Sequence, residues 1–324
     1  MNWRWCRWLG AAVLLLVASA CRLPSPQPEQ TITDCPADAA IALQILGSGG
    51  PIADDERAAS GYLLWLDGRA QVLIDAGSGI EPRFGAAAAR LSDLRLIALS
   101  HLHTDHSAAL PGLVKSAYFS QRQRPLAVSG PSGNDRFPSV AEFMQALFNP
   151  GSGAYRYLAG ILDGSDGMFA MHPQVIDASP GVITSVQLSP AASGTPPQEL
   201  TVEAMGVHHG IVPALAYRVQ AGDRRIVFAG DQSSDNPDMA AFSADADVLV
   251  AHYAIPDDAG RGARSLHRTP SQWARLAVAA RVDKLVLSHW MQRSLRQREN
   301  DGQSLRAIYD GSLIEATDGA CIVL

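Results

Sequence analysis

Residues 100–106 contain four side chains that bind metal ions in proteins, and they follow directly on an apolar run. The segment is Ser-His-Leu-His-Thr-Asp-His. In an extended chain, side chains two residues apart point the same way, so His101 and His103 can bind one ion together. Asp105 and His106 lie where the chain turns into a helix. Adjacent side chains diverge there, which places these two better for a second ion nearby. Mixed imidazole and carboxylate ligands favour zinc, with iron or manganese as alternatives.

This segment resembles the signature of the metallo-β-lactamase superfamily, His-x-His-x-Asp-His at the end of a strand. Further segments resemble the branch that contains ribonuclease Z and its arylsulfatase-like and cyclic-nucleotide-phosphodiesterase-like relatives. These segments are residues 100–113, 129–133, 209–218, 228–231 and 287–289. The resemblance covers about residues 41–324. It implies an α+β fold, an αββα sandwich of two mixed β-sheets flanked by helices.

The resemblance also implies the remaining ligands of a two-ion site. His209 matches the third histidine of the first ion and is preferred over its neighbour His208, which would then line the pocket or support a ligand. Asp231 matches the carboxylate that both ions share, and His289 matches the last ligand of the second ion. The expected ligands of two Zn²⁺ ions, with Mn²⁺ or Fe²⁺ as alternatives, are His101, His103, Asp105, His106, His209, Asp231 and His289.

A metal-dependent hydrolase acting on ester bonds is the activity that this ligand set implies. A hydroxide shared by the two metals would attack a small ester, such as a phosphodiester or a sulfate ester. Asp105 would orient the hydroxide as well as bind metal. His267 would act as an acid or stabilise the transition state, although a surface histidine beside a helix cap is the alternative. His252 could line the pocket, but packing is the preferred interpretation.

Three other functions remain open. One is a β-lactamase or lactonase-type hydrolase, and the others are a redox protein and a metal-binding protein without catalysis. Position 231 holds aspartate where the commonest zinc β-lactamases have cysteine. Position 103 holds histidine where redox members usually have glutamate. The full set of seven ligands argues against a catalytically silent protein, so the hydrolase is favoured.

Apolar runs and turn residues predict the elements that position these groups. Residues 62–66 and 70–74 flank Asp-Gly and predict a hairpin. Residues 313–317 and 320–324 predict a second hairpin that closes the chain. Strands come in consecutive pairs with helices between the groups, which favours two sheets packed face to face. Residues 132–200 are rich in aromatics, methionine, glycine and proline, and predict an insertion with one or two helices.

The first 40 residues predict export. Residues 1–21 have an arginine-bearing start, a short apolar stretch and Ala-Ser-Ala-Cys, the pattern of a lipoprotein-type signal peptide. Cys21 would carry a lipid that attaches the protein to a membrane, and Arg22 favours the outer membrane. Residues 22–40 are a linker, and three prolines within residues 23–30 make that part extended. We therefore expect a periplasmic, lipid-anchored protein, with plain secretion or an uncleaved anchor as alternatives.

The remaining cysteines and the net charge bear on redox state and partners. Cys35 and Cys321 would remain in the mature chain, where a disulfide and two buried thiols are equally open. The net charge is −6 and no long basic run is present. Nucleic-acid binding usually needs a basic patch, so we expect a small-molecule ester substrate and no nucleic acid. The oligomeric state is not predicted.

Overall fold

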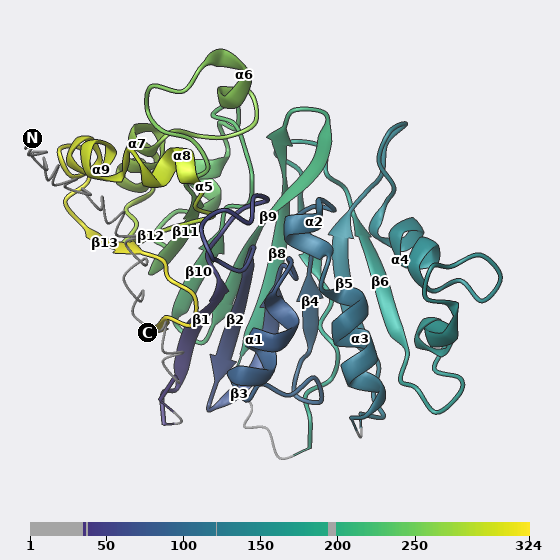
Figure 1. Cartoon of the computed structure of the whole chain (residues 1–324). Helices are drawn as coiled ribbons and strands as arrows, with labels where there is room; N and C mark the ends of the chain where they lie inside the picture. Colours follow the sequence, from purple (N-terminus) through teal and green to yellow (C-terminus); the bar gives the residue numbers. More distant parts are fainter. Residues whose placement is uncertain (1–34, 37, 121, 194–198) are drawn as a thin grey trace, which may run out of the picture. The chain divides into compact units, whose positions relative to one another are not determined.

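The computed structural model describes residues 35–324 apart from residues 37, 121 and 194–198 (Figure 1). The predicted signal peptide, Cys21 and most of the linker lie outside the described residues. Among the described residues, no helix has the length and apolar character that crossing a membrane requires.

Two seven-stranded mixed sheets form the centre of the fold (Figure 1). The first has the order β14-β1-β2-β3-β4-β5-β6, and the second has the order β13-β12-β11-β10-β9-β8-β7. The strands of the first sheet are β1 (Ile41–Gly47), β2 (Gly61–Leu66), β3 (Arg69–Ile74), β4 (Leu96–Ala98), β5 (Leu126–Pro131), β6 (Met171–Ile176) and β14 (Cys321–Val323). The strands of the second are β7 (Ile183–Val186), β8 (Leu200–His209), β9 (Val212–Ala221), β10 (Arg224–Phe228), β11 (Val248–His252), β12 (Lys284–Ser288) and β13 (Ser312–Glu315).

Helices cover the outer face of each sheet. They do so because apolar side chains alternate between the two faces of the strands, so the outer face must also be buried. In β2, Tyr62 and Leu64 belong to the apolar cluster between the sheets, whereas Leu63 packs under the outer helices. In β11, Val250 faces inward and Leu249 faces the other helical layer. The helices are α1 (Ile80–Ala86), α2 (Thr104–Ser107), α3 (Leu110–Tyr118), α4 (Val140–Phe148), α5 (Met239–Phe242), α6 (Arg261–Arg264), α7 (Pro270–Ala280), α8 (Gln292–Leu295) and α9 (Arg298–Arg306), with the 3-10 helix η1 (Arg156–Leu162). The predicted αββα sandwich is confirmed.

One of the two predicted hairpins is present and the other is wrong. Strands β2 and β3 pair antiparallel, as expected. The last two strands do not form a hairpin, because β13 pairs parallel with β12 in the second sheet and β14 pairs antiparallel with β1 in the first. The Asp318-Gly319 turn carries the chain from one sheet to the other. The Asp318 carboxylate holds this crossing, since it accepts hydrogen bonds from the Ser48 and Ala58 amides and pairs with Arg83.

Residues 132–200, the expected insertion, contribute elements to both halves of the sandwich. They include α4 and η1 on the outer face of the first sheet. They also include β6 and β7, which are the edge strands of the first and second sheets.

A disulfide joins Cys35 to Cys321, with the two Cα atoms 5.4 Å apart. Of the two alternatives for these cysteines, the bridge is therefore confirmed. It connects the segment before β1 to β14, which is the neighbour of β1 in the sheet. The bridge closes a loop with a sequence separation of 286 residues, so it restricts nearly the whole unfolded chain.

We expect Cys321→Ser to lower the free energy of unfolding by about 2–4 kcal/mol, because the unfolded chain regains the freedom that the cross-link removes. Urea denaturation without reductant measures the loss. The Cys35→Ser and double variants serve as controls and should lose the same amount, since each removes the same bridge. Equal midpoints for the wild type with and without reductant would contradict this expectation.

Candidate metal centre

The expected metal ligands converge at one end of the sandwich because each follows the carboxyl end of a strand. His101 comes after β4, His209 ends β8, Asp231 comes after β10, and His289 comes after β12. Strands β10, β11 and β12 run parallel, so their carboxyl ends lie at the same edge of the sheet. Helix α2, which carries Asp105, lies at this end of the first sheet (Figure 1).

One group of three imidazoles consists of His101, His103 and His209. Their ligand nitrogens all lie within 4.8 Å of one another. Nε2 of His101 is 3.0 Å from Nδ1 of His103. Two nitrogens bound to one tetrahedral zinc ion lie about 3.3 Å apart, so this spacing fits a shared ion. Nδ1 of His209 is 3.0 Å from the Leu266 carbonyl, which leaves its Nε2 for the ion.

A second group combines imidazoles with carboxylates. Nε2 of His106 lies 3.3 Å from Nε2 of His289, and Oδ2 of Asp105 lies 3.2 Å from the same His289 nitrogen. Asp231 faces both groups, with Oδ2 3.7 Å from Nε2 of His209 and Oδ1 3.4 Å from Nε2 of His289. The structure thus brings all seven expected ligands together, and the donor set fits divalent metal ions.

Two of the histidines and the central carboxylate are in the form that binds metal, whereas His106 must lose a proton first. Burial lowers the pKa of both His101 and His103, so their imidazoles are neutral, the form that binds metal. Burial alone would raise the pKa of Asp231, but His289 and His267 hold it well below its usual range. Burial would likewise lower the pKa of His106, but Asp75 and Asp105 raise it well above its usual range. The centre therefore holds ionised carboxylates that favour a cation.

Asp75 orients His106, a member of the second group, and the sequence analysis did not identify it. Its Oδ2 lies 2.8 Å from Nδ1 of His106, and its two oxygens also accept hydrogen bonds from the Ser100 amide and hydroxyl. These contacts fix the His106 ring so that Nε2 faces the centre. The available signal was an acidic residue directly after a buried strand, β3, that pairs with β4.

His252 also lies at the centre, where sequence reasoning preferred a packing role. Its Nδ1 is 2.7 Å from Oδ1 of Asp231, and its Nε2 is 3.2 Å from the Tyr62 hydroxyl. Both ring nitrogens are therefore engaged, and the ring orients the carboxylate that faces both groups. Its place at the end of β11, between β10 and β12, was the available signal.

His267 lines the cavity in front of the centre, whereas His208 lies away from it. This cavity has a volume of about 480 Å³ and is also lined by Leu266, Met291 and Arg293. Nδ1 of His267 is 3.7 Å from Oδ2 of Asp231, and burial lowers the His267 pKa to about 3. His208 is exposed on the opposite face of β8.

An αββα sandwich with imidazoles and carboxylates gathered at its strand ends defines a class of metal-dependent hydrolases. A family model described as the metallo-beta-lactamase superfamily matches residues 54–289. The chain belongs to this superfamily, and it is a metal-dependent hydrolase.

Several known proteins are similar to this chain. A ribonuclease Z from Nocardia farcinica is 28% identical over 303 residues, covering 85% of this chain and 95% of the relative. Among solved structures, the metallo-beta-lactamase fold protein YhfI from Bacillus subtilis has a TM-score of 0.65 at 18% identity, covering 87% of this chain and 98% of that one. The short form of human tRNase Z has a TM-score of 0.61 at 21% identity, with the same coverage. The two solved structures establish similarity of fold.

The expectation of no nucleic-acid partner is contradicted by these comparisons and is wrong. The relatives carry the names ribonuclease Z and tRNase Z, which state an action on RNA. The net charge of −6 misled the prediction. Binding to RNA depends on the local potential around a site, which a sum over the whole chain does not describe.

We expect Asp75→Asn to weaken metal binding about 10–100-fold, because the His106 ring loses its carboxylate partner. Competition with a chromophoric zinc chelator measures the affinity. Asp247→Asn is the matched control: Asp247 accepts hydrogen bonds from Arg224 and Arg225 beside the start of β11, at the opposite end of the strand from His252. Equal zinc affinities for Asp75→Asn and the wild type would rule out the support role.

Proposed function

We propose that this protein is a phosphodiester hydrolase that works with two zinc ions. The observation that carries the proposal is the position of Asp231, whose two oxygens face the two ligand groups. One carboxylate placed in this way can serve two ions. One ion would be held by His101, His103 and His209, and the other by Asp105, His106 and His289, with Asp231 shared between them.

The chain's own residues would bind the ester and handle protons. A pair of divalent ions in such a site supplies Lewis-acid chemistry and a nucleophile at neutral pH. Asp105 would accept a hydrogen bond from the attacking water and so orient it. His267 faces the cavity and would place a ring N–H against the leaving oxygen. Arg293, held by a hydrogen bond from its Nε to the Ala254 carbonyl, would bind the anionic oxygen of the ester.

Two observations support a phosphodiester over the other esters. The ribonuclease Z relatives match most of this chain and most of their own length. The cavity also presents a guanidinium, which suits an anionic ester better than a neutral lactone. Both RNA and small diesters contain this bond, so both belong in the test.

We also propose that the protein is exported and anchored through a lipid on Cys21. The composition of residues 1–21 supports this proposal, and so does the Cys35–Cys321 disulfide, since such bonds persist in oxidising compartments. Mass spectrometry of the native protein should find acylated Cys21 at the amino terminus. A cytoplasmic chain that retains Met1 would overturn the proposal.

The catalytic proposal predicts that the zinc-loaded protein hydrolyses bis(p-nitrophenyl) phosphate or RNA with a 3′ extension. It should act poorly on p-nitrophenyl sulfate and nitrocefin. A chelator should abolish the activity and added zinc should restore it. Diesterase activity that survives chelation, or hydrolysis of the sulfate or nitrocefin alone, would sink the proposal.

The role of His267 has its own test. We expect His267→Ala to lower kcat about 10²–10³-fold, because the leaving oxygen loses the ring N–H that stabilises its developing negative charge. Zinc content should not change. His172→Ala is the matched control, since His172 is an exposed histidine on β6. A kcat for His267→Ala within twofold of the control would remove His267 from the mechanism.

A further inference from the structure

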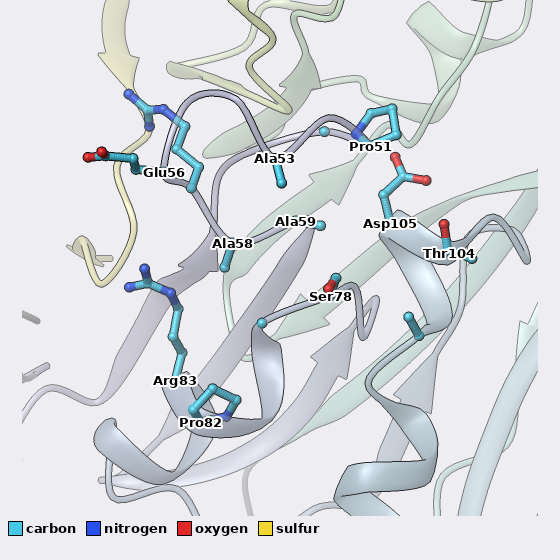
Figure 2. A pocket seen from close by; sticks show the side chains of 14 residues that line it. Pro51, Ala53, Glu56, Ala58, Ala59, Ser78, Pro82, Arg83, Thr104 and Asp105 are labelled. Atoms are coloured by element: carbon cyan, nitrogen blue, oxygen red, sulfur yellow. The ribbon is translucent and has the colours of Figure 1, made fainter.

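A second cavity lies beside the one in front of the metal centre, and Asp105 lines both. Figure 2 shows the side chains that line the second cavity. Its volume is about 500 Å³. It shares Pro51, Thr104 and Asp105 with the cavity lined by His267, so the two cavities adjoin at these residues. Of the seven expected metal ligands, Asp105 alone lines it. Binding the ions therefore does not account for this space, which we call the Ala53 pocket.

Three segments from the first half of the chain form the walls of the Ala53 pocket. They are residues 50–59 between β1 and β2, residues 78–83 around the start of α1, and residues 104–108 in and after α2. Ala53 and Ser78 line the pocket from two of these segments (Figure 2).

Backbone contacts tie these walls together, so the pocket is formed in advance. The Ala59 amide donates to the Ser78 carbonyl at 2.9 Å, and the Ala76 amide donates to the His106 carbonyl at 2.8 Å. A Cβ added at Gly77 would lie 2.1 Å from the Asp105 carbonyl oxygen, so only glycine allows α2 to approach this turn. The pocket is thus fixed in position relative to the metal centre.

The charges at the pocket are already matched. Nη2 of Arg83 lies 2.9 Å from Oδ2 of Asp318, and Nε of Arg57 lies 3.9 Å from Oδ2 of Asp55. Glu56 adds an exposed carboxylate at the wall. A further anion would gain no free cation here and would meet a like charge. The pocket therefore suits an uncharged group.

The remaining wall is apolar and built of small side chains, with a few hydroxyls. Proline rings and alanine methyl groups give surfaces against which a flat ring can pack, and the Ser78 and Thr104 hydroxyls can hydrogen-bond to its edge. The apolar residues are Pro51, Ala53, Ala58, Ala59, Pro82 and Ala108.

We infer that the Ala53 pocket binds one arm of the phosphodiester, an uncharged planar ring, while the phosphoryl group lies at the metal centre. The inference rests on the proposed function, because it assumes a phosphoryl group bound beside Asp105. A phosphodiester has two substituents, and one of them can extend past Asp105 into the Ala53 pocket. The ring can belong to a nucleoside or to an aryl ester.

Phosphate monoesters that differ only in their single arm test this inference by direct binding. Isothermal titration of the zinc-loaded protein compares methyl phosphate, phenyl phosphate and uridine 3′-monophosphate. Burial of a ring predicts that at least one ring-bearing ligand binds about tenfold or more tightly than methyl phosphate. A preference for uridine monophosphate identifies a nucleoside arm, and a preference for phenyl phosphate identifies an aryl arm.

Two variants fill the pocket from different walls. Ser78→Phe and Ala53→Phe should each abolish the ring preference and leave the affinity for methyl phosphate and the zinc content unchanged. Ala86→Phe is the matched control, because Ala86 is exposed at the end of α1 and lines neither cavity. It should keep the preference.

Equal wild-type affinities for the three ligands, or a preference that survives in both variants, would overturn the inference. The proposed function fails separately. A wild-type protein that hydrolyses diesters but binds the three ligands equally counts against the pocket alone. A clear ring preference in a protein that hydrolyses no diester counts against the proposed function alone.

Discussion

Three carboxyl groups are buried among histidines at the end of the sandwich that holds the candidate metal centre, and their charges must be compensated there. Asp75, Asp105 and Asp231 are each at most 6% exposed. A buried carboxylate is costly unless hydrogen bonds, an opposite charge or a metal ion compensates it. Asp75 is compensated by Ser100 and His106. Asp105 and Asp231 instead face imidazole nitrogens at distances that suit shared cations, so metal binding and local stability are coupled here.

The two sheets supply the framework for this coupling. Parallel pairing of β10, β11 and β12 brings Asp231, His252 and His289 to one edge, and parallel pairing of β3 and β4 brings Asp75 to His106. The two cavities share Pro51, Thr104 and Asp105, which follow β1 and β4. Under the proposed function, the strand ends determine where the metals, the ester and its substituents can lie.

The sequence predicted the parts of the site that depend on local spacing. The alternation of His101 and His103 required no tertiary information, whereas Asp231 and His289 followed only from the family resemblance. The support from Asp75 and His252 was not predicted, because a polar residue after a buried strand becomes informative only once the pairing of distant strands is known. The closing hairpin was wrong because an Asp-Gly turn looks the same whether it reverses a strand or crosses between sheets. A chain-wide net charge likewise could not describe the surface around one site.

Anomalous diffraction from crystals of the zinc-loaded protein, recorded at the zinc edge, shows directly whether two ions bind at this centre. Two strong peaks are expected at one end of the sandwich. One should lie among His101, His103 and His209, the other among Asp105, His106 and His289, with Asp231 contacting both. A single peak, or peaks away from these side chains, would contradict a two-ion centre built on a shared carboxylate.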